Sequence, residues 1–171
     1  EISLGLVGSE MCIRDRFKEL TEDPAFQQVL AFIMPGVSME MFKLQLQQCK
    51  TNLDFQKAFC YKFLHDLIAK RTDGFDMDCT ALTDKTKNYT FISNHRDIVL
   101  DSGLLSVGLL DNQFPTTVEI AIGDNLLIYD WIKKLVRVNK AFIVQRALTM
   151  RQMLESSARM SRYIHLSLIH I

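Results

Sequence analysis

The stretch Phe91–Asp101 holds the residues best suited to chemistry. Its apolar start stops at His95, and two carboxylates, Asp97 and Asp101, follow shortly after. Histidine titrates near neutral pH, and a neighbouring carboxylate can orient the ring and stabilise its charged form. We therefore predict that His95 is a general base. The alternative is a structural histidine that caps the next helix.

Two later runs have the same form, an apolar segment followed by polar residues. Glu119–Leu126 contains Gly123-Asp124-Asn125, and Ala141–Arg146 ends on a lone cation. The guanidinium of Arg146 presents a planar fork that suits phosphate oxygens, whereas the alternative is an ordinary surface ion pair. Ligands of parallel sheets bind beyond the carboxyl ends of the strands, so these polar groups predict one shared pocket.

The elements that must position these residues follow from hydrophobic periodicity. Short apolar runs predict three strands, and longer periodic segments between and after them predict three helices. The strands are expected at Asn88–Ser93, Thr117–Ile122 and Ala141–Val144, and the helices at Ile98–Leu110, Leu126–Val136 and Thr149–Tyr163. This alternation is typical of an α/β fold with a mostly parallel sheet and right-handed crossover helices.

Three helices are expected before the sheet. Asp23 before Pro24 predicts the start of the first, which ends at Pro35-Gly36, and Ser38 can cap the second, with an apolar face that includes Phe42. The third, about Leu53 to Lys70, has a wide apolar stripe of Phe55, Phe59, Phe63 and Leu67. We interpret the stripe as core packing, and the alternative is a surface for lipid or a partner.

Composition limits the classes of function. The chain has 171 residues, 48% of them hydrophobic, which suffices for one core, and 20 basic residues balance 20 acidic ones. No global field favours nucleic acid. The cysteines lack a C-x-x-C pair, which favours reduced thiols over a disulfide scaffold or a zinc site. The longest low-charge stretch, about Pro24 to Val37, is too short to cross a bilayer.

The two ends of the chain are set apart. Residues 1–16 and 166–171 resemble translated sequencing-adapter read-through, so we expect neither to be native protein and leave both out of the fold. We divide the remainder into an N-terminal helical region, 17–87, and a partial α/β core, 88–165.

Over about Leu20 to His165 the chain resembles the glycerol-phosphate and lysophosphatidate acyltransferases, and more closely a bacterial subgroup of 1-acylglycerol-3-phosphate acyltransferases. The family's first motif is a histidine, four residues and an aspartate after a strand, and Asn94-His95-Arg96 resembles its opening. The resemblance implies that His95 removes the proton of the acceptor hydroxyl. It implies also that an aspartate holds the imidazole.

The chain departs from that motif in its spacing. Leu100 stands at the expected aspartate position, with Asp101 one residue later and Asp97 three earlier. We choose Asp101 as the orienting carboxylate, because a residue one to two turns into a helix can point back at the ring. Asp97 is the second choice and can serve the helix N-terminus instead.

The family's second motif is a glycine and an apolar run ending in arginine. Lys140–Arg146 is similar to it but lacks the glycine. By resemblance, Arg146 binds the acceptor phosphate, assisted by Arg96, and Gly123, Asp124 and Asn125 form an acceptor loop. The later motifs, a Glu-Gly-Thr-like phosphate clamp and a proline-bearing strand, are absent, which predicts an incomplete acceptor site in a fragment.

The resemblance implies transfer of an acyl group from coenzyme A or acyl carrier protein to a glycerol-phosphate or lysophosphatidate hydroxyl. No metal, other cofactor or nucleic acid is expected, and the fragment alone is expected to be inactive. The implied location is cytoplasmic, at the inner face of the cell membrane. The main alternative is a non-catalytic lipid- or protein-binding module. A hydrolase that uses His95 with Ser93 or Ser102 is disfavoured, because neither serine lies in a Gly-x-Ser-x-Gly elbow. A kinase is disfavoured because the sequence has no glycine-rich phosphate loop.

Overall fold

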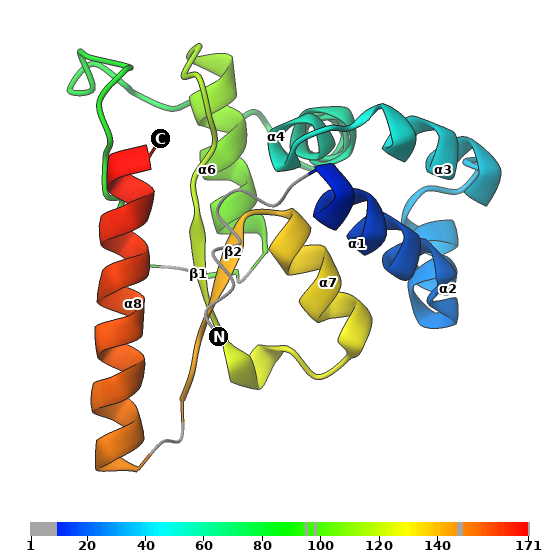
Figure 1. The fold of residues 1–171 in the computed structure, drawn as a ribbon. Helices are drawn as coiled ribbons and strands as arrows, with labels where there is room; N and C mark the ends of the chain where they lie inside the picture. Colours follow the sequence, from blue (N-terminus) through cyan, green and yellow to red (C-terminus); the bar gives the residue numbers. More distant parts are fainter. Residues whose placement is uncertain (1–9, 95, 98, 147–148, 171) are drawn as a thin grey trace.

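The computed structural model describes residues 10–94, 96–97, 99–146 and 149–170, and the side chains from 13 to 165 within these ranges (Figure 1). The chain is mixed α/β, with mostly helical structure and a small parallel sheet. The elements, in order, are α1 (Glu10–Glu22), α2 (Pro24–Ile33), α3 (Met39–Gln48), α4 (Asn52–Phe55), the π-helical η2 (Gln56–Tyr61), α5 (Lys62–Arg71), α6 (Leu100–Asp111), β1 (Ile120–Gly123), the 3₁₀-helical η3 (Asp124–Leu126), α7 (Asp130–Val138), β2 (Ala141–Val144) and α8 (Met150–His170).

Local capping chemistry explains where the first helices begin. The Asp23 carboxylate accepts hydrogen bonds from the backbone N–H groups of Ala25 and Phe26, at 3.0 and 3.3 Å. The Ser38 hydroxyl accepts one from the N–H of Met41 at 3.2 Å. These bonds satisfy amides that have no partner inside the helix. The predicted starts of α2 and α3 are therefore confirmed.

The predicted long helix over 53–70 is confirmed as a continuous run of α4, η2 and α5. Thr51 and Asp54 form a capping box at its start. The core interpretation of its aromatic stripe holds for Phe55 and Phe59, which are 3% and 5% exposed, whereas Phe63 is 37% exposed.

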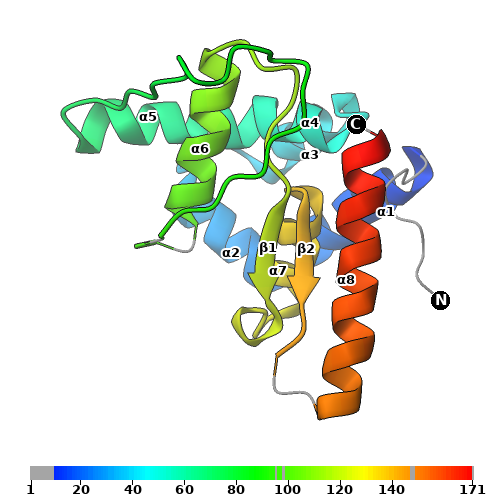
Figure 2. The same cartoon turned by 90° about the vertical axis from the view of Figure 1, so that its left-hand side faces the viewer.

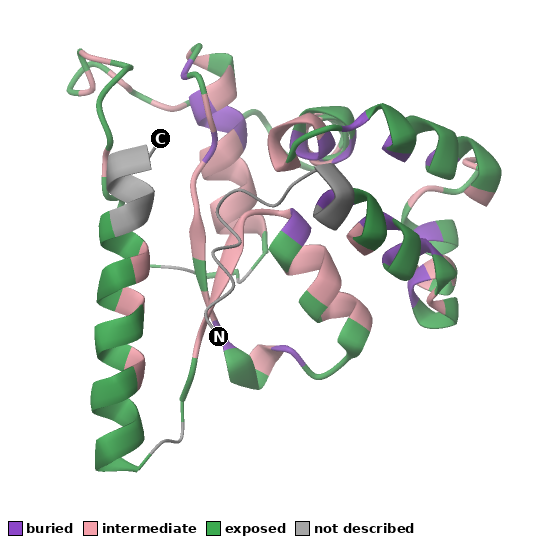
Figure 3. Ribbon diagram, viewed as in Figure 1, coloured by how far each residue is buried: buried purple, intermediate pink, exposed green. Residues whose placement is uncertain are grey.

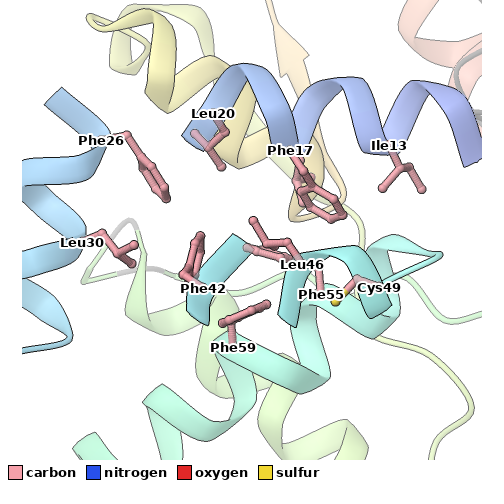
Figure 4. Close-up of a cluster of buried hydrophobic side chains, with 11 residues drawn as sticks. Ile13, Phe17, Leu20, Phe26, Leu30, Phe42, Leu46, Cys49, Phe55 and Phe59 are labelled. Atoms are coloured by element: carbon pink, nitrogen blue, oxygen red, sulfur yellow. The ribbon is translucent and has the colours of Figure 1, made fainter. Parts of the chain in front are cut away.

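The main core lies between the N-terminal helices and α7 (Figure 4). Phe42 and Phe59 have ring centroids 4.7 Å apart, and Val138 of α7 is fully buried in the same cluster. Helix α1 starts within the segment 1–16 that was left out of the expected fold, and Ile13 belongs to this core. The sheet is therefore attached to the helical region through α7.

β1 and β2 are parallel, with Ile120 opposite Ala141 and Gly123 opposite Val144. Helix α7 forms the crossover between them, so this part of the predicted α/β pattern is confirmed. The predicted helix over 126–136 is realised as η3 and α7, and the strand over 117–122 as β1. Helices α7 and α8 lie on opposite faces of the sheet (Figures 1 and 2).

The predicted strand Asn88–Ser93 is wrong. The segment has no regular secondary structure, and the described sheet consists of β1 and β2. Ile92 is 93% exposed, which a buried central strand would not allow. A strand is stabilised by ladder hydrogen bonds to a neighbour, so β propensity without a partner is insufficient. The helix predicted from Ile98 is observed as α6 from Leu100, and Ile98 itself lies outside the described residues.

Candidate functional site

A cavity of about 1050 Å³ lies between the sheet, the start of α6, the segment 85–93 and α8. Its wall includes Asp97, Asp101, Gly123 and Arg146. These residues come from three segments that are far apart in the sequence. The polar residues after the apolar runs predicted that these segments share one pocket. The structure thus brings two of the candidate carboxylates and the candidate phosphate-binding arginine to one space.

His95, the candidate base, lies outside the described residues. What the structure gives is the backbone that follows it. The Asp101 carboxylate accepts hydrogen bonds from the N–H groups of Arg96 and Asp97, at 2.6 and 3.1 Å. Asp101 therefore reaches back from the first turn of α6 and fixes the two residues next to His95 in the chain.

Asp97 has a different role. One of its oxygens accepts hydrogen bonds from the N–H groups of Val99 and Leu100, at 2.9 and 2.8 Å. The bonds from Leu100 and Val99 stabilise the ionised form and lower the pKa of Asp97. Asp97 thus caps the start of α6, as the alternative assignment for this residue anticipated.

Arg146 lies beyond the carboxyl end of β2 and beside the loop that follows β1. Its backbone N–H donates to Asp124 at 3.1 Å. A Cβ added to Gly123 would lie 2.9 Å from Arg146 Nε and 2.5 Å from Asn125 Oδ1. The loop predicted as Gly123, Asp124 and Asn125 is therefore in contact with Arg146, and only glycine leaves room for this approach.

The guanidinium of Arg146 makes no ion pair within the described part of the chain. The surface ion-pair alternative therefore has no support there. A cation that lines a cavity and lacks a carboxylate partner can accept an anionic ligand. Arg146 and Arg96 are both exposed, but Arg96 does not line the cavity.

Most of the remaining wall is apolar. It includes Phe91, Leu105, Leu109 and Phe142. An aliphatic chain placed there would lose contact with water, which is favourable in proportion to the apolar area covered. The cavity thus combines an apolar surface with three cations, Arg146, Lys85 and Lys87, and three carboxylates, Asp97, Asp101 and Glu119.

The sequence analysis missed one polar pair in the cavity wall. The Tyr163 hydroxyl of α8 donates to Glu119 at 3.0 Å, and the Tyr163 ring lies 5.0 Å from that of Phe142. Burial, followed by the charge and hydrogen bond of Glu119, raises the pKa of Tyr163, so the hydroxyl stays protonated at neutral pH. No local pattern signals this contact, because the two residues are 44 positions apart.

A second polar cluster lies outside this cavity. His65 Nε2 is 3.2 Å from Asp111 Oδ1, and the Tyr61 hydroxyl donates to the same oxygen. These contacts join α6 to the helix before it. None of the three residues lines the cavity, so the cluster is a link between helices.

Within the described ranges, no group of three or more His, Cys, Asp or Glu side chains is placed to hold a metal ion. None of the helices described is long and apolar enough to cross a bilayer. No family model, curated protein or solved structure matches this chain.

Proposed function

We propose that this chain carries part of the site of an acyltransferase. The reaction is transfer of an acyl group from a thioester of coenzyme A or acyl carrier protein to a hydroxyl of a glycerol-phosphate or lysophosphatidate acceptor. The observation that carries the proposal is the shared cavity, in which Asp101 and Arg146 meet an apolar wall. Arg146 would bind the acceptor phosphate, and the apolar wall would cover the acyl chain. Asp101 would hold the loop beside His95, which takes the proton of the acceptor hydroxyl.

In this proposal His95 takes the proton of the acceptor hydroxyl as the oxygen attacks the thioester carbonyl. His95 then returns the proton to the sulfur as the C–S bond breaks, and the thiol leaves. General base catalysis of this kind contributes about 100-fold to 10,000-fold in rate. Asp101 is a positioning residue, because its carboxylate binds the backbone N–H groups that follow His95. Asp97 supports the same loop by capping α6.

Arg146 positions the acceptor through its phosphate. Its backbone is held by Asp124, and its guanidinium approaches Gly123 at the end of β1. Arg96 has less support as a second phosphate-binding residue, since it is outside the cavity wall.

Acyl transfer is to be measured with glycerol 3-phosphate or a lysophosphatidate as acceptor. We expect His95→Ala to abolish transfer while acceptor binding is kept. Arg146→Ala should weaken acceptor binding, and Arg146→Lys should restore part of it. Transfer by His95→Ala at the parent rate would refute the base assignment.

A second candidate function is a non-catalytic module that binds lipid or protein. The observation that favours it is an exposed apolar surface on α2 and α3, where Phe32 is 88% and Leu44 60% exposed. Such surfaces often mark interaction sites. Binding of vesicles that is lost in Phe32→Ser, together with no acyl transfer by the parent protein, would favour this module over the enzyme.

A further inference from the structure

The described side chains of helix α8, residues 150–165, make few contacts with the rest of the protein. Each of α1 to α7 has at least one buried residue among the described side chains, whereas α8 has none (Figure 3). Met150 and Leu154 are 76% and 66% exposed. Within residues 150–165, only Ser156, Met160 and Tyr163 are partly buried, and their spacing places them on one narrow stripe. Burial of apolar area by residues 150–165 therefore contributes little to the docking of α8.

Tyr163 makes the specific contacts that hold this helix. Among the described hydrogen bonds, ion pairs and ring contacts, those between α8 and the sheet region both belong to Tyr163: its hydroxyl donates to Glu119, and its ring packs against Phe142. The other bonds described for α8, such as that between Arg151 and Glu155, lie within the helix and its first turn. Among the described side chains of α8, residues 150–165, docking thus depends on Tyr163.

Helix α8 also covers the cavity. Tyr163 and its neighbour Ile164 belong to the same wall as Arg146 and Phe142. We propose that α8 is a lid over this cavity and that Tyr163 is its latch. This inference rests on the cavity and on the docking of α8, and it holds whether or not the protein transfers acyl groups.

The energetics favour repeated local opening. A hydrogen bond and a ring contact each contribute little net stability, so a segment held by one of each opens far more often than the core. A ligand that fills the cavity adds contacts to the closed state and shifts the equilibrium towards it. A suitable ligand has an anionic group for Arg146 and an aliphatic chain for the wall around Phe142.

Hydrogen exchange of the whole chain, followed by mass spectrometry, tests the lid, with dodecyl phosphate as the probe. In the free protein we expect the amides of α8 to exchange faster than those of α6. Dodecyl phosphate should slow exchange in α8. Tyr163→Ala should speed exchange in α8 by about tenfold, the change expected on loss of one hydrogen bond and one ring contact, and leave α6 unchanged.

Two further variants sharpen the test. Tyr163→Phe keeps the ring contact and should give an intermediate rate, while Met153→Ala on the same helix is the matched control and should match the parent. Alanine is the best helix former, so faster exchange in Tyr163→Ala cannot come from helix propensity. The lid would be overturned if the amides of α8 and α6 exchanged at the same rate in the free protein, or if dodecyl phosphate had no effect on α8. It would also be overturned if Tyr163→Ala and Met153→Ala exchanged at the same rate in α8, or if Tyr163→Ala raised the rate in α6 as much as in α8.

Discussion

The hydroxyl of Thr117 donates a hydrogen bond to Gln56 Oε1 across 2.5 Å, although 61 positions separate the two residues. Both side chains are buried, at 4% and 3% exposed. The amide of Gln56 also donates to the side-chain and backbone oxygens of Asn139, at 2.9 and 3.3 Å. One residue of the π-helical η2 thus joins the segment before β1 to the segment before β2.

Replacing Gln56 by leucine should destabilise the protein strongly. Leucine has a similar side-chain volume but cannot bond Thr117 or Asn139, and leaving the buried Thr117 hydroxyl unsatisfied costs about 1–3 kcal/mol. The measurement is the free energy of unfolding from urea titration. Gln45→Leu, at an exposed position of α3, is the control and should change stability little. Equal unfolding free energies for the two variants would contradict the linking role.

Phe59 and Phe63, both in the aromatic stripe of the long helix, form a matched pair of substitution sites. Phe59→Ala should cost about 3–5 kcal/mol, because the ring is buried against Phe42 and Phe55. Phe63→Ala should cost much less, since that ring is 37% exposed. Thermal unfolding followed by circular dichroism compares them. A larger loss for Phe63→Ala would mean that the core is placed wrongly.

Asp97 gives a prediction about pH. Its carboxylate accepts bonds from Leu100 and Val99, which lower its pKa in the folded protein below the unfolded value of about 4. The unfolded state then binds the proton more readily, so the stability from this cap is present above that pH and is lost as the pH falls through the folded pKa.

Asp97→Ala should therefore lower the urea midpoint at pH 7 and have little effect in strong acid, where the parent carboxyl is protonated. Asp66→Ala, at an exposed position of α5, is the control. A deficit in Asp97→Ala that stays constant down to the lowest pH would show that charge at this cap is irrelevant.

Gly123→Ala tests how Arg146 is placed. The added Cβ would lie 2.9 Å from Arg146 Nε and 2.5 Å from Asn125 Oδ1. Both are ends of side chains that can move, so we expect little loss of stability but a displaced guanidinium. Titration calorimetry with glycerol 3-phosphate should show binding weakened by about tenfold, as expected for loss of one charged hydrogen bond.

Asn125→Ala is the companion variant, since it removes one of the two obstructing atoms and should restore part of the binding to Gly123→Ala. Unchanged affinity in Gly123→Ala would separate Arg146 from the phosphate site. Unchanged affinity in Arg146→Ala would do so as well.

The sequence by itself determined the features that depend on near neighbours. Asp23 and Ser38 predicted helix starts correctly, because a capping bond joins residues two or three positions apart. The apolar run Ala141–Val144 predicted β2 with its exact bounds. Periodicity also gave the order of helices and strands around the parallel pair.

Only the tertiary structure decided which distant groups meet. Asn88–Ser93 has the composition of a strand, but strand formation depends on ladder hydrogen bonds to a neighbouring strand, and the described sheet contains only β1 and β2. The Gln56 and Tyr163 contacts span tens of positions, and no local period encodes them. The cavity that joins Asp101 to Arg146 is likewise a product of packing. Local bonds fix helices and caps, whereas the site depends on how those elements are placed against one another.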